Sequence, residues 1–549
     1  MKTGGRLIVD ALEANGADRV YCVPGESYLA VLDALHDSAI RTIVCRQEGG
    51  AAMMADCHGR LTGRPGICFV TRGPGATNAS AGVHIAMQDS SPLILFIGQV
   101  ASHARDREAF QEVDYRRFFG DIAKWVVEID DPARVPELVT RAFAVATSGR
   151  PGPVVVSLPE DMLTALAEAP AALTATPVET APGEAVMHRL AELLGAASRP
   201  IAILGGTRWS AAAKARMENA AEAWALPVAC SFRRQMLFDH LHPCYAGDIG
   251  IGPNPRLAAA VKEADLVLLV GGRFGEMPSS DYTLVKSPYP DQVLVHVHPD
   301  PDELGRVYRP ALAINATPEA FTAALERLRP GATPDWAEAT EALHGAYLAW
   351  STPPESGPGP VRMGPIMRHL EHVLPENAIL CNGAGNYATW VHRFHRFRLY
   401  GTQAAPTSGS MGYGTPAAVA AKALHPDRTV VAFAGDGCFL MNGQEFATAV
   451  QYDLPIVVIV VNNGTYGTIR MHQERNYPGR VVATDLRNPD FAALARAYGG
   501  HGETVEATEE FAPAFQRALA SGRPAIVEIR LDPEAITPTR TLSEIREGR

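Results

Sequence analysis

The chain has 549 residues, of which 47% are hydrophobic and 20% are charged, and its formal net charge is −11. This balance is typical of a soluble globular protein with three or four domains, because a single hydrophobic core does not grow to this size. The acidic balance and the absence of Lys/Arg blocks argue against a nucleic-acid partner. The longest apolar runs have the length of strands, so we expect no membrane span.

The N-terminal residues run directly into an amphipathic pattern, without the apolar core and cleavage site of a signal peptide. The eight cysteines are scattered along the chain and form no C-x-x-C pair. We therefore expect a cytoplasmic protein with reduced thiols, without a disulfide framework or a structural zinc site.

Short apolar runs alternate with longer helical patterns along most of the chain, which is the pattern of parallel α/β layers. The runs that we interpret as strands are 20–23, 41–45, 66–70, 93–97, 154–157, 200–204, 266–270, 293–297, 378–381, 429–434 and 456–461. Two stretches rich in small residues and proline, 165–182 and 351–361, indicate linkers. The sequence therefore predicts three doubly wound parallel-sheet domains, at residues 1–165, 185–335 and 360–535.

Two polar motifs follow consecutive buried strands in the third domain. Gly435-Asp436-Gly437 ends the strand 429–434, and Asn462-Asn463-Gly464 ends the strand 456–461. With a helix between them, both strand ends lie at the same edge of a parallel sheet, where open α/β folds bind ligands. Each motif alone would most simply be a surface turn. Together they predict a Mg²⁺ site for a diphosphate, because Mg²⁺ prefers oxygen ligands and glycines let the backbone approach phosphates.

With these motifs the chain resembles the thiamine-diphosphate enzyme superfamily, and within it the acetolactate synthase-like group, over nearly its whole length. The resemblance implies that the three domains are the pyrimidine-binding, central and diphosphate-binding domains. It also implies that Asp436 and Asn463 are side-chain ligands of Mg²⁺ and that Thr465 offers its carbonyl oxygen.

Two further segments of the third domain match the binding site of this group. The loop after the strand 378–381 looks like the loop that contacts the diphosphate, with Gly385 and Asn386 as the candidate residues. Met411 occupies the position of the apolar side chain that bends the cofactor at the hinge between its two rings. A methionine elsewhere would most often fill a core, but the glycines around Met411 leave room for a ligand.

Thiamine acts as an electron sink only after its thiazolium carbon loses a proton. A protein carboxyl group that is hydrogen-bonded to the aminopyrimidine ring of the cofactor promotes that loss. Glu48 follows the strand 41–45 and precedes a helix that begins with small residues. A glutamate there could serve only as a partner of the helix dipole. However, the segment 46–63 looks like the glutamate segment of the group. The resemblance implies that Glu48 reaches the cofactor of a neighbouring subunit, in a homodimer or homotetramer.

Three further positions concern the substrate pocket. The segment 71–78 matches the acetolactate synthase-like pattern, except that Arg72 replaces a small residue, and its backbone could donate to a substrate carboxylate. Gln111 and Lys124 match positions that line the pocket, and Gln111 is the more plausible polar contact in the active site. The alternative is that both are ordinary surface residues.

Two departures bear on the substrate. His472 stands where acetolactate synthases of the biosynthetic type carry a tryptophan, which favours a more polar acceptor pocket. The His-His pair of pyruvate decarboxylases is missing near His103, which we interpret as a surface histidine.

The central domain holds FAD in synthases and oxidases of this group. Arg150 and Arg273 match flavin-contacting positions, but the glycine pairs 205–206 and 271–272 lack the full G-x-G-x-x-G context. His298 replaces the acidic strand end that usually meets the flavin ribose. FAD is therefore possible but not favoured.

We expect a thiamine-diphosphate-dependent carboligase or lyase that decarboxylates a 2-oxo acid and transfers the activated aldehyde to a carbonyl acceptor. The alternatives with the same cofactor are a simple 2-oxo acid decarboxylase, a 2-hydroxyacyl-CoA lyase and a flavin-linked oxidase. An alternative from another class is a non-catalytic thiamine-diphosphate-binding protein. Glu48 argues against that alternative, because binding needs only the metal site whereas activation needs the glutamate.

Overall fold

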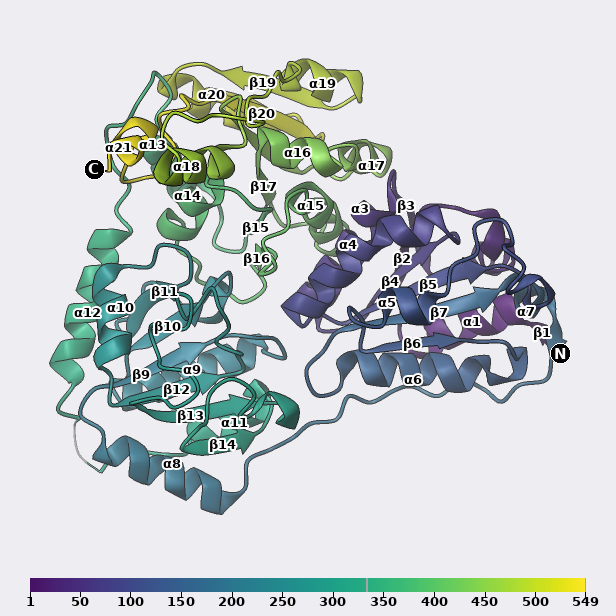
Figure 1. The fold of residues 1–549 in the computed structure, drawn as a ribbon, viewed down its shortest axis with the longest axis horizontal. Helices are drawn as coiled ribbons and strands as arrows, with labels where there is room; N and C mark the ends of the chain where they lie inside the picture. Colours follow the sequence, from purple (N-terminus) through teal and green to yellow (C-terminus); the bar gives the residue numbers. More distant parts are fainter. Residues whose placement is uncertain (332–333, 549) are drawn as a thin grey trace.

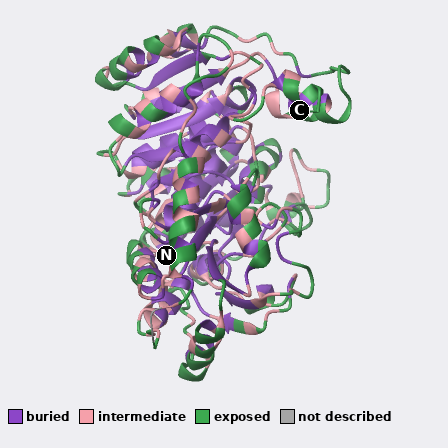
Figure 2. Cartoon of the chain, turned by 90° about the vertical axis from the view of Figure 1, so that its left-hand side faces the viewer, coloured by how far each residue is buried: buried purple, intermediate pink, exposed green. Residues whose placement is uncertain are grey.

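The computed structural model describes residues 1–331 and 334–548, which form three domains, each around a six-stranded sheet flanked by helices (Figure 1). Within each of the three sheets every pair of neighbouring strands is parallel. The predicted fold class is therefore confirmed. The strands are mostly buried, while the outer faces of the helices are exposed (Figure 2).

The sheet of the N-terminal domain has the order β3-β2-β4-β5-β7-β6. Its strands are β2 (Arg19–Cys22), β3 (Arg41–Val44), β4 (Gly66–Val70), β5 (Leu93–Gln99), β6 (Trp125–Glu128) and β7 (Pro153–Pro159). Its helices are α1 (Gly4–Ala14), α2 (Leu29–His36), α3 (Glu48–Thr62), α4 (Pro74–Asp89), α5 (Tyr115–Phe119), α6 (Val135–Thr147) and α7 (Glu160–Thr164). A short antiparallel pair, β1 (Lys2–Thr3) and β8 (Leu166–Ala167), joins the start of this domain to the start of the expected linker.

The sheet of the central domain has the order β11-β10-β9-β12-β13-β14. Its strands are β9 (Pro200–Leu204), β10 (Val228–Ser231), β11 (Tyr245–Ile249), β12 (Leu266–Val270), β13 (Val293–His298) and β14 (Leu312–Asn315). Its helices are α8 (Glu184–Ala196), α9 (Ala211–Ala223), α10 (Pro255–Glu263), α11 (Pro318–Leu325) and α12 (Ala337–Trp350). Helix α12 packs on this domain, because Trp336 at its start donates to the carbonyl of Trp224 at 3.0 Å.

The sheet of the C-terminal domain has the order β16-β15-β17-β18-β20-β19. Its strands are β15 (Ile379–Asn382), β16 (Gln403–Ala404), β17 (Val430–Gly435), β18 (Val457–Asn462), β19 (His501–Val505) and β20 (Ala525–Arg530). Its helices are α13 (Met363–Val373), α14 (Tyr387–Phe394), α15 (Gly414–Leu424), α16 (Asp436–Asn442), α17 (Glu445–Gln451), α18 (Gly467–Asn476), α19 (Phe491–Ala497), α20 (Thr508–Ala520) and α21 (Leu542–Arg546).

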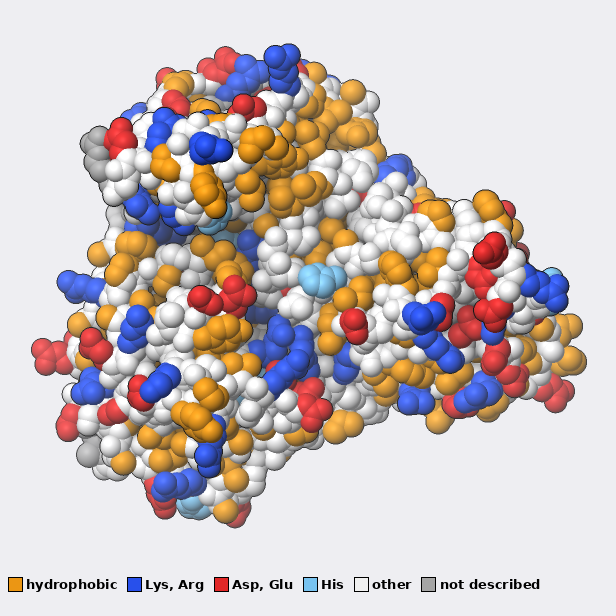
Figure 3. Space-filling model, viewed as in Figure 1, with side chains coloured by type: hydrophobic (Ala, Val, Ile, Leu, Met, Phe, Trp, Pro, Cys, Tyr) orange, Lys and Arg blue, Asp and Glu red, His pale blue; other side chains and the backbone are white. Residues whose placement is uncertain are grey.

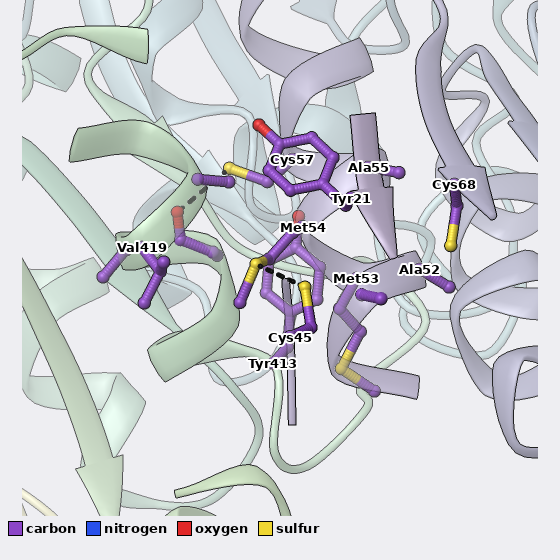
Figure 4. Packing of buried hydrophobic residues seen from close by; sticks show 14 of the residues in the cluster. Tyr21, Cys45, Ala52, Met53, Met54, Ala55, Cys57, Cys68, Tyr413 and Val419 are labelled. Atoms are coloured by element: carbon purple, nitrogen blue, oxygen red, sulfur yellow. Dashed lines mark hydrogen bonds between the residues drawn. The ribbon is translucent and has the colours of Figure 1, made fainter. Parts of the chain in front are cut away.

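The N-terminal and C-terminal domains share one hydrophobic core, built on helix α3 against α4 and α15 (Figure 4). Small residues allow this close packing: a Cβ on Gly59 would lie 2.1 Å from the carbonyl oxygen of Pro92, and one on Gly82 would lie 2.4 Å from the Cβ of Ala52. The start of α3, which carries Glu48, is thereby fixed relative to the C-terminal domain.

A buried ionic cluster also joins these two domains. Arg60 of α3 pairs with Asp56 and Asp89, and Tyr413 donates to Asp56 at 2.6 Å. Asp89 accepts in addition from the backbone N–H of Thr407 at 2.7 Å. Although burial opposes ionisation, the positive charge of Arg60 keeps the pKa of Asp89 below its ordinary value. The cluster thus holds the loop that leads to Met411 against the N-terminal domain.

None of the helices in the described part of the chain combines the length and the apolar character that crossing a lipid bilayer requires.

Candidate active site

The two strand ends of the C-terminal domain meet at one cavity of about 250 Å³. Asp436 begins helix α16 directly after β17, and Asn463 follows β18. Eight of the residues that the sequence indicated for cofactor or metal binding line this cavity: Gly385, Asn386, Met411, Gly435, Asp436, Gly437, Asn463 and Thr465. The sequence placed the helix of this unit at about residues 443–452, whereas the structure has α16 beginning at Asp436 itself and a separate α17.

The Asp436 carboxylate is buried and held by three donors. One oxygen accepts from the N–H of Gly437 at 2.8 Å, and the other accepts from the N–H of Gly464 at 2.9 Å and from the amide of Asn488 at 2.8 Å. Burial raises the pKa of Asp436 above its ordinary value, and these donors oppose the rise. A cation at this position would favour the ionised form further. Asn488 was missed from the sequence, because it lies in a loop far from both motifs and follows no strand.

The loop after β18 supplies the other oxygens. Asn463 accepts from the N–H of Thr465 at 3.2 Å, and the Thr465 hydroxyl donates to the carbonyl of Thr484 at 2.9 Å. Carboxylate, amide and carbonyl oxygens are the ligand set that Mg²⁺ prefers. Among residues 1–331 and 334–548 no group of three His, Cys, Asp or Glu side chains could hold a metal. The site at Asp436 does not need such a group, because two of its expected ligand oxygens come from an amide and a backbone carbonyl.

Glycines keep the wall of the cavity open at the level of the backbone. A Cβ on Gly437 would lie 2.5 Å from the ring of Tyr466, and one on Gly385 would lie 2.8 Å from the ring of Tyr387. Gly385 also has a φ of +147°, which favours glycine. No side chain fits at these positions without displacing the two rings, so the backbone of the wall stays bare and forms a cradle that a diphosphate can approach.

Asn386 and Met411 also line this cavity. The Asn386 N–H donates to the hydroxyl of Thr468 at 3.0 Å, and its side-chain amide donates to the carbonyl of Ile536 at 3.1 Å. Asn386 therefore ties its own loop to the first turn of α18 and to the loop at Ile536. Met411 is half-buried, and the N–H of Gly412 that follows it contacts the Cys438 sulfur at 3.2 Å, which fixes the Met411 loop to the start of α16.

Glu48 and Gln111 lie on the N-terminal domain. Within the single chain they line neither the Asp436 cavity nor the larger second cavity described below. Glu48 begins α3, is half-buried, and accepts from the exposed amide of Asn78 at 3.0 Å. Gln111 adopts a φ of +66°, and its backbone packs so closely on Gly73 that a Cβ there would lie 2.9 Å from the Gln111 carbonyl oxygen. Within one chain the Asp436 cavity therefore has no glutamate base.

A buried glutamate of the C-terminal domain fixes the turn before Glu48. Glu445 accepts from the N–H groups of Arg46 and Gln47, both at 3.0 Å. Burial raises the pKa of Glu445, while Thr448 and the two backbone donors oppose the rise. The sequence offered no signal for this role, because the contact joins residues almost 400 positions apart.

Lys124 and the loop at Arg72 have polar groups that are engaged within the single chain. The Lys124 amine donates to the carbonyls of Val145 at 2.6 Å and Ser148 at 2.7 Å, and burial lowers its pKa to about 8. It thus caps the end of α6. Like Gln111 it lines neither cavity of the single chain, and its expected place in the pocket stays a prediction.

Arg72 is engaged in ion pairs with Glu26 at 3.0 Å and with Glu160, and it donates to the carbonyl of Phe110 at 3.2 Å. It therefore braces the segment that carries Gln111. The neighbouring N–H of Gly73 donates to the Tyr115 hydroxyl at 2.9 Å, so this donor is not available to a substrate carboxylate.

A second cavity of about 1140 Å³ is lined mostly by the central and C-terminal domains, with residues 88–90 of the N-terminal domain at its edge. It shares part of its lining with the Asp436 cavity, namely Ala384, Gly385, Asn386, Gly409 and Thr468. Arg273 and His472 line this second cavity. Arg150 does not line it, because it pairs with Glu303 at 2.9 Å and donates to Ser90 at 2.9 Å. His298 is likewise outside the lining, whereas its neighbour on the same strand face, His296, contributes to it.

The fold and this site together define an enzyme that uses thiamine diphosphate. Family models for thiamine pyrophosphate enzymes, another name for the same cofactor, match the chain in its three parts: the N-terminal TPP binding domain at residues 2–118, the central domain at 187–325 and the C-terminal TPP binding domain at 383–529.

Curated relatives are acetolactate synthases. The large subunit from Corynebacterium glutamicum is 32% identical over 97% of this chain and 87% of its own length. Isozyme 1 and isozyme 2 large subunits from Escherichia coli K12 are 32% and 30% identical, over 97% and 96% of this chain and 94% and 95% of their own lengths. The chain belongs to the acetolactate synthase-like group of thiamine-diphosphate-dependent enzymes.

Proposed function

We propose that this protein decarboxylates a 2-oxo acid and transfers the resulting activated aldehyde to a carbonyl acceptor, with thiamine diphosphate and Mg²⁺ as cofactors. The observation that carries the proposal is the cavity in which Asp436, Asn463 and a glycine cradle come together. The similarity to acetolactate synthases over 96–97% of the chain supports the same reaction class.

In this proposal Asp436, Asn463 and the Thr465 carbonyl hold Mg²⁺. Gly385, Gly435 and Gly437 would leave room for the diphosphate. Asn386 would hold the surrounding segments in place, and Met411 would support the cofactor at the hinge between its two rings. When bound, thiamine diphosphate supplies the electron sink that decarboxylation of a 2-oxo acid needs. The protein residues bind, orient and move protons around it.

The base and the substrate contact come from a second copy of the chain in a homodimer or homotetramer. The position of Glu48 outside the Asp436 cavity of its own chain supports this arrangement. Glu48 is half-buried, its carboxylate carries only one side-chain donor, Asn78, among the described contacts, and it therefore has capacity to hold a proton on a ring nitrogen. Gln111 on the same domain would orient the substrate carbonyl or carboxylate.

We further propose that the reaction needs no flavin and takes place in the cytoplasm. Arg150, which matches a flavin-contacting position, is engaged with Glu303, Ser90 and the carbonyl of Met87. All eight cysteines are free and buried, which fits a reducing compartment.

The test is turnover of the purified protein with thiamine diphosphate, Mg²⁺ and pyruvate, with and without an added aldehyde. We expect CO₂ release and a ligation product detected by mass spectrometry, both lost without cofactor and in the Asp436→Ala variant. Release of CO₂ without any ligation product would replace the carboligase by a simple decarboxylase. No CO₂ from pyruvate or from a panel of larger 2-oxo acids would contradict the proposal.

A further inference from the structure

Arginines dominate the charged lining of the second cavity. They are Arg233, Arg234, Arg273, Arg306, Arg393 and Arg475. Lys and Arg side chains gather in the hollow between the domains, as Figure 3 shows. The lining also contains carboxylates, so the net charge that a ligand meets in the cavity depends on which of these charges are already paired.

The innermost arginines stand at the carboxyl edge of the central sheet. Arg233 and Arg234 follow β10, and Arg273 follows β12. In the order β11-β10-β9-β12-β13-β14 the direction of winding reverses between β9 and β12. Ligands of open α/β sheets bind at such a reversal. The topology therefore places Arg273 beside the reversal and Arg233 and Arg234 one strand away from it, and all three line the second cavity.

These three arginines have no carboxylate in direct contact within the described part of the chain. Arg233 is 4% exposed, it donates to the carbonyl of Pro406, and its Nε has no partner. Arg234 is 4% exposed and donates to the carbonyl of Asp89 at 2.8 Å. Arg273 donates to the carbonyl of Gln88. Among the described residues, none of the three forms an ion pair with a carboxylate.

Most of the carboxylates of the lining are already engaged or unsuited to neutralise these charges. Asp89 pairs with Arg60, and Glu303 pairs with Arg150 and Arg306. Burial raises the pKa of Asp248 to about 7, so much of its charge is absent near neutrality. Glu276 is exposed. Burial lowers the pKa of Arg233, Arg234 and Arg273 to about 10 each, which shows the cost of holding their charges without counterions.

These charges lie close to the reactive site. Arg233 contacts the carbonyl of Pro406, three residues before Gly409, which lines both cavities. At about 1140 Å³ the second cavity is far larger than a three-carbon acid needs. A molecule whose carbonyl lies in the Asp436 cavity can thus extend toward the arginines.

We propose that Arg233, Arg234 and Arg273 bind an anionic group, a phosphate or a carboxylate, at the far end of the carbonyl acceptor. The inference rests on the proposed carboligase function and names its acceptor class. Arginine suits this role because its planar fork binds both kinds of oxyanion with two hydrogen bonds.

The test compares matched acceptors with pyruvate as the fixed donor. Succinic semialdehyde is paired with butanal, and glyceraldehyde 3-phosphate with glyceraldehyde. We expect kcat/KM at least about tenfold higher for the charged member of one pair, since a charge-assisted bidentate contact is worth that much. The pair that shows the difference separates carboxylate from phosphate recognition. Equal or faster ligation of both neutral acceptors would overturn the inference and leave the proposed function intact.

Variants identify the arginines. We expect Arg273→Gln and Arg234→Gln to reduce the charged-to-neutral ratio of kcat/KM about tenfold, with partial recovery in the Lys variants. The matched control is Arg189→Gln, which removes an exposed arginine of the same domain that pairs with Glu192 at 2.8 Å, and it should leave the ratio unchanged. An unchanged ratio in both cavity variants would contradict the inference.

A binding measurement without turnover keeps the two proposals separable. Calorimetric titration of the protein with succinate and with glycerol 3-phosphate should show binding of at least one of them, weakened about tenfold in Arg273→Gln. Absence of binding by both compounds, or purified protein that retains flavin seen by its visible absorbance, would contradict the inference whatever the turnover assays show.

Discussion

The N-terminal and C-terminal domains have the same sheet topology but carry different chemistry at the same edge. Numbered from 1 to 6 within each domain, both sheets have the strand order 2-1-3-4-6-5. After the third strand the C-terminal domain places Asp436, whereas the N-terminal domain places the Arg72 loop. The segment after the second strand carries Met411 in the C-terminal domain and Glu48 in the N-terminal domain. The topology thus fixes where a site forms, and the residues at the strand ends decide what it does.

The central domain sharpens this comparison, because its strand order is 3-2-1-4-5-6 in the same numbering. Its carboxyl edge holds arginines in place of a metal site or a base. Three sheets of similar size are therefore proposed to serve three purposes: one to anchor the cofactor, one to supply the base, and one to bind the acceptor.

The largest effect is expected at the edge of the N-terminal domain. Glu48→Gln removes the acid–base group while retaining the shape, so turnover should fall about 10²- to 10⁴-fold. Calorimetric binding of thiamine diphosphate should change little, because the proposed metal site lies on the other domain. Turnover close to that of the wild type would remove Glu48 from the role of base.

The next largest effect is expected at the buried ionic cluster between the N-terminal and C-terminal domains. Asp89→Asn leaves Arg60 buried without its principal counterion, and the free energy of unfolding should fall by about 3–5 kcal/mol. Urea denaturation measures this change. Glu137→Gln breaks an exposed pair with Arg134 and serves as the control, with an expected change of less than about 0.5 kcal/mol. Equal effects of the two variants would show that the buried cluster does not hold the domains together.

A smaller effect is expected around the metal site. Asn488→Ala removes a donor to Asp436 but no metal ligand, so the affinity for Mg²⁺ should fall about 10- to 100-fold. The measurement is a Mg²⁺ titration of activity at saturating thiamine diphosphate. An unchanged Mg²⁺ dependence would show that Asn488 does not orient the carboxylate.

The smallest effect concerns the central domain and depends on pH. Burial raises the pKa of Asp248 from 3.8 to about 7, so the folded protein binds this proton more tightly than the unfolded chain. The contribution to stability is present below pH 3.8 and is lost as the pH rises toward 7. Asp248→Asn cannot ionise, so it should match the wild type at or below about pH 4 and become increasingly more stable than the wild type as the pH rises to 8. A stability difference that is independent of pH would contradict this assignment.

The sequence predicted the strands well where they are apolar runs. Each strand expected from such a run is present, and its ends agree within two residues. Strands with mixed composition, such as β19 and β20, were not identified, and neither was the short pair β1–β8, because their pairing depends on contacts across the chain. The start of α16 at Asp436 was missed because Gly-Asp-Gly is equally typical of a turn.

Local sequence patterns also predicted one part of the candidate site, the pair of strand ends. Asp436 and Asn463 end consecutive strands, so local pattern and sheet geometry suffice to bring them together. Asn488 and Glu445 act through contacts with residues distant in sequence, and no local pattern reveals them. The sequence alone does not show that Arg233 and Arg234 lie at the carboxyl edge of the central sheet, because that position depends on the strand order.

The central claim is that each active site joins the C-terminal domain of one chain to the N-terminal domain of another. It is tested by coexpressing Glu48→Gln and Asp436→Ala chains with different affinity tags and isolating the mixed oligomer by both tags. Each variant alone is expected to be inactive. In a mixed dimer one site receives both lesions and the other receives none, so we predict about half of the wild-type activity per oligomer. An inactive mixed oligomer would contradict the account, because it would mean that each site is built within one chain.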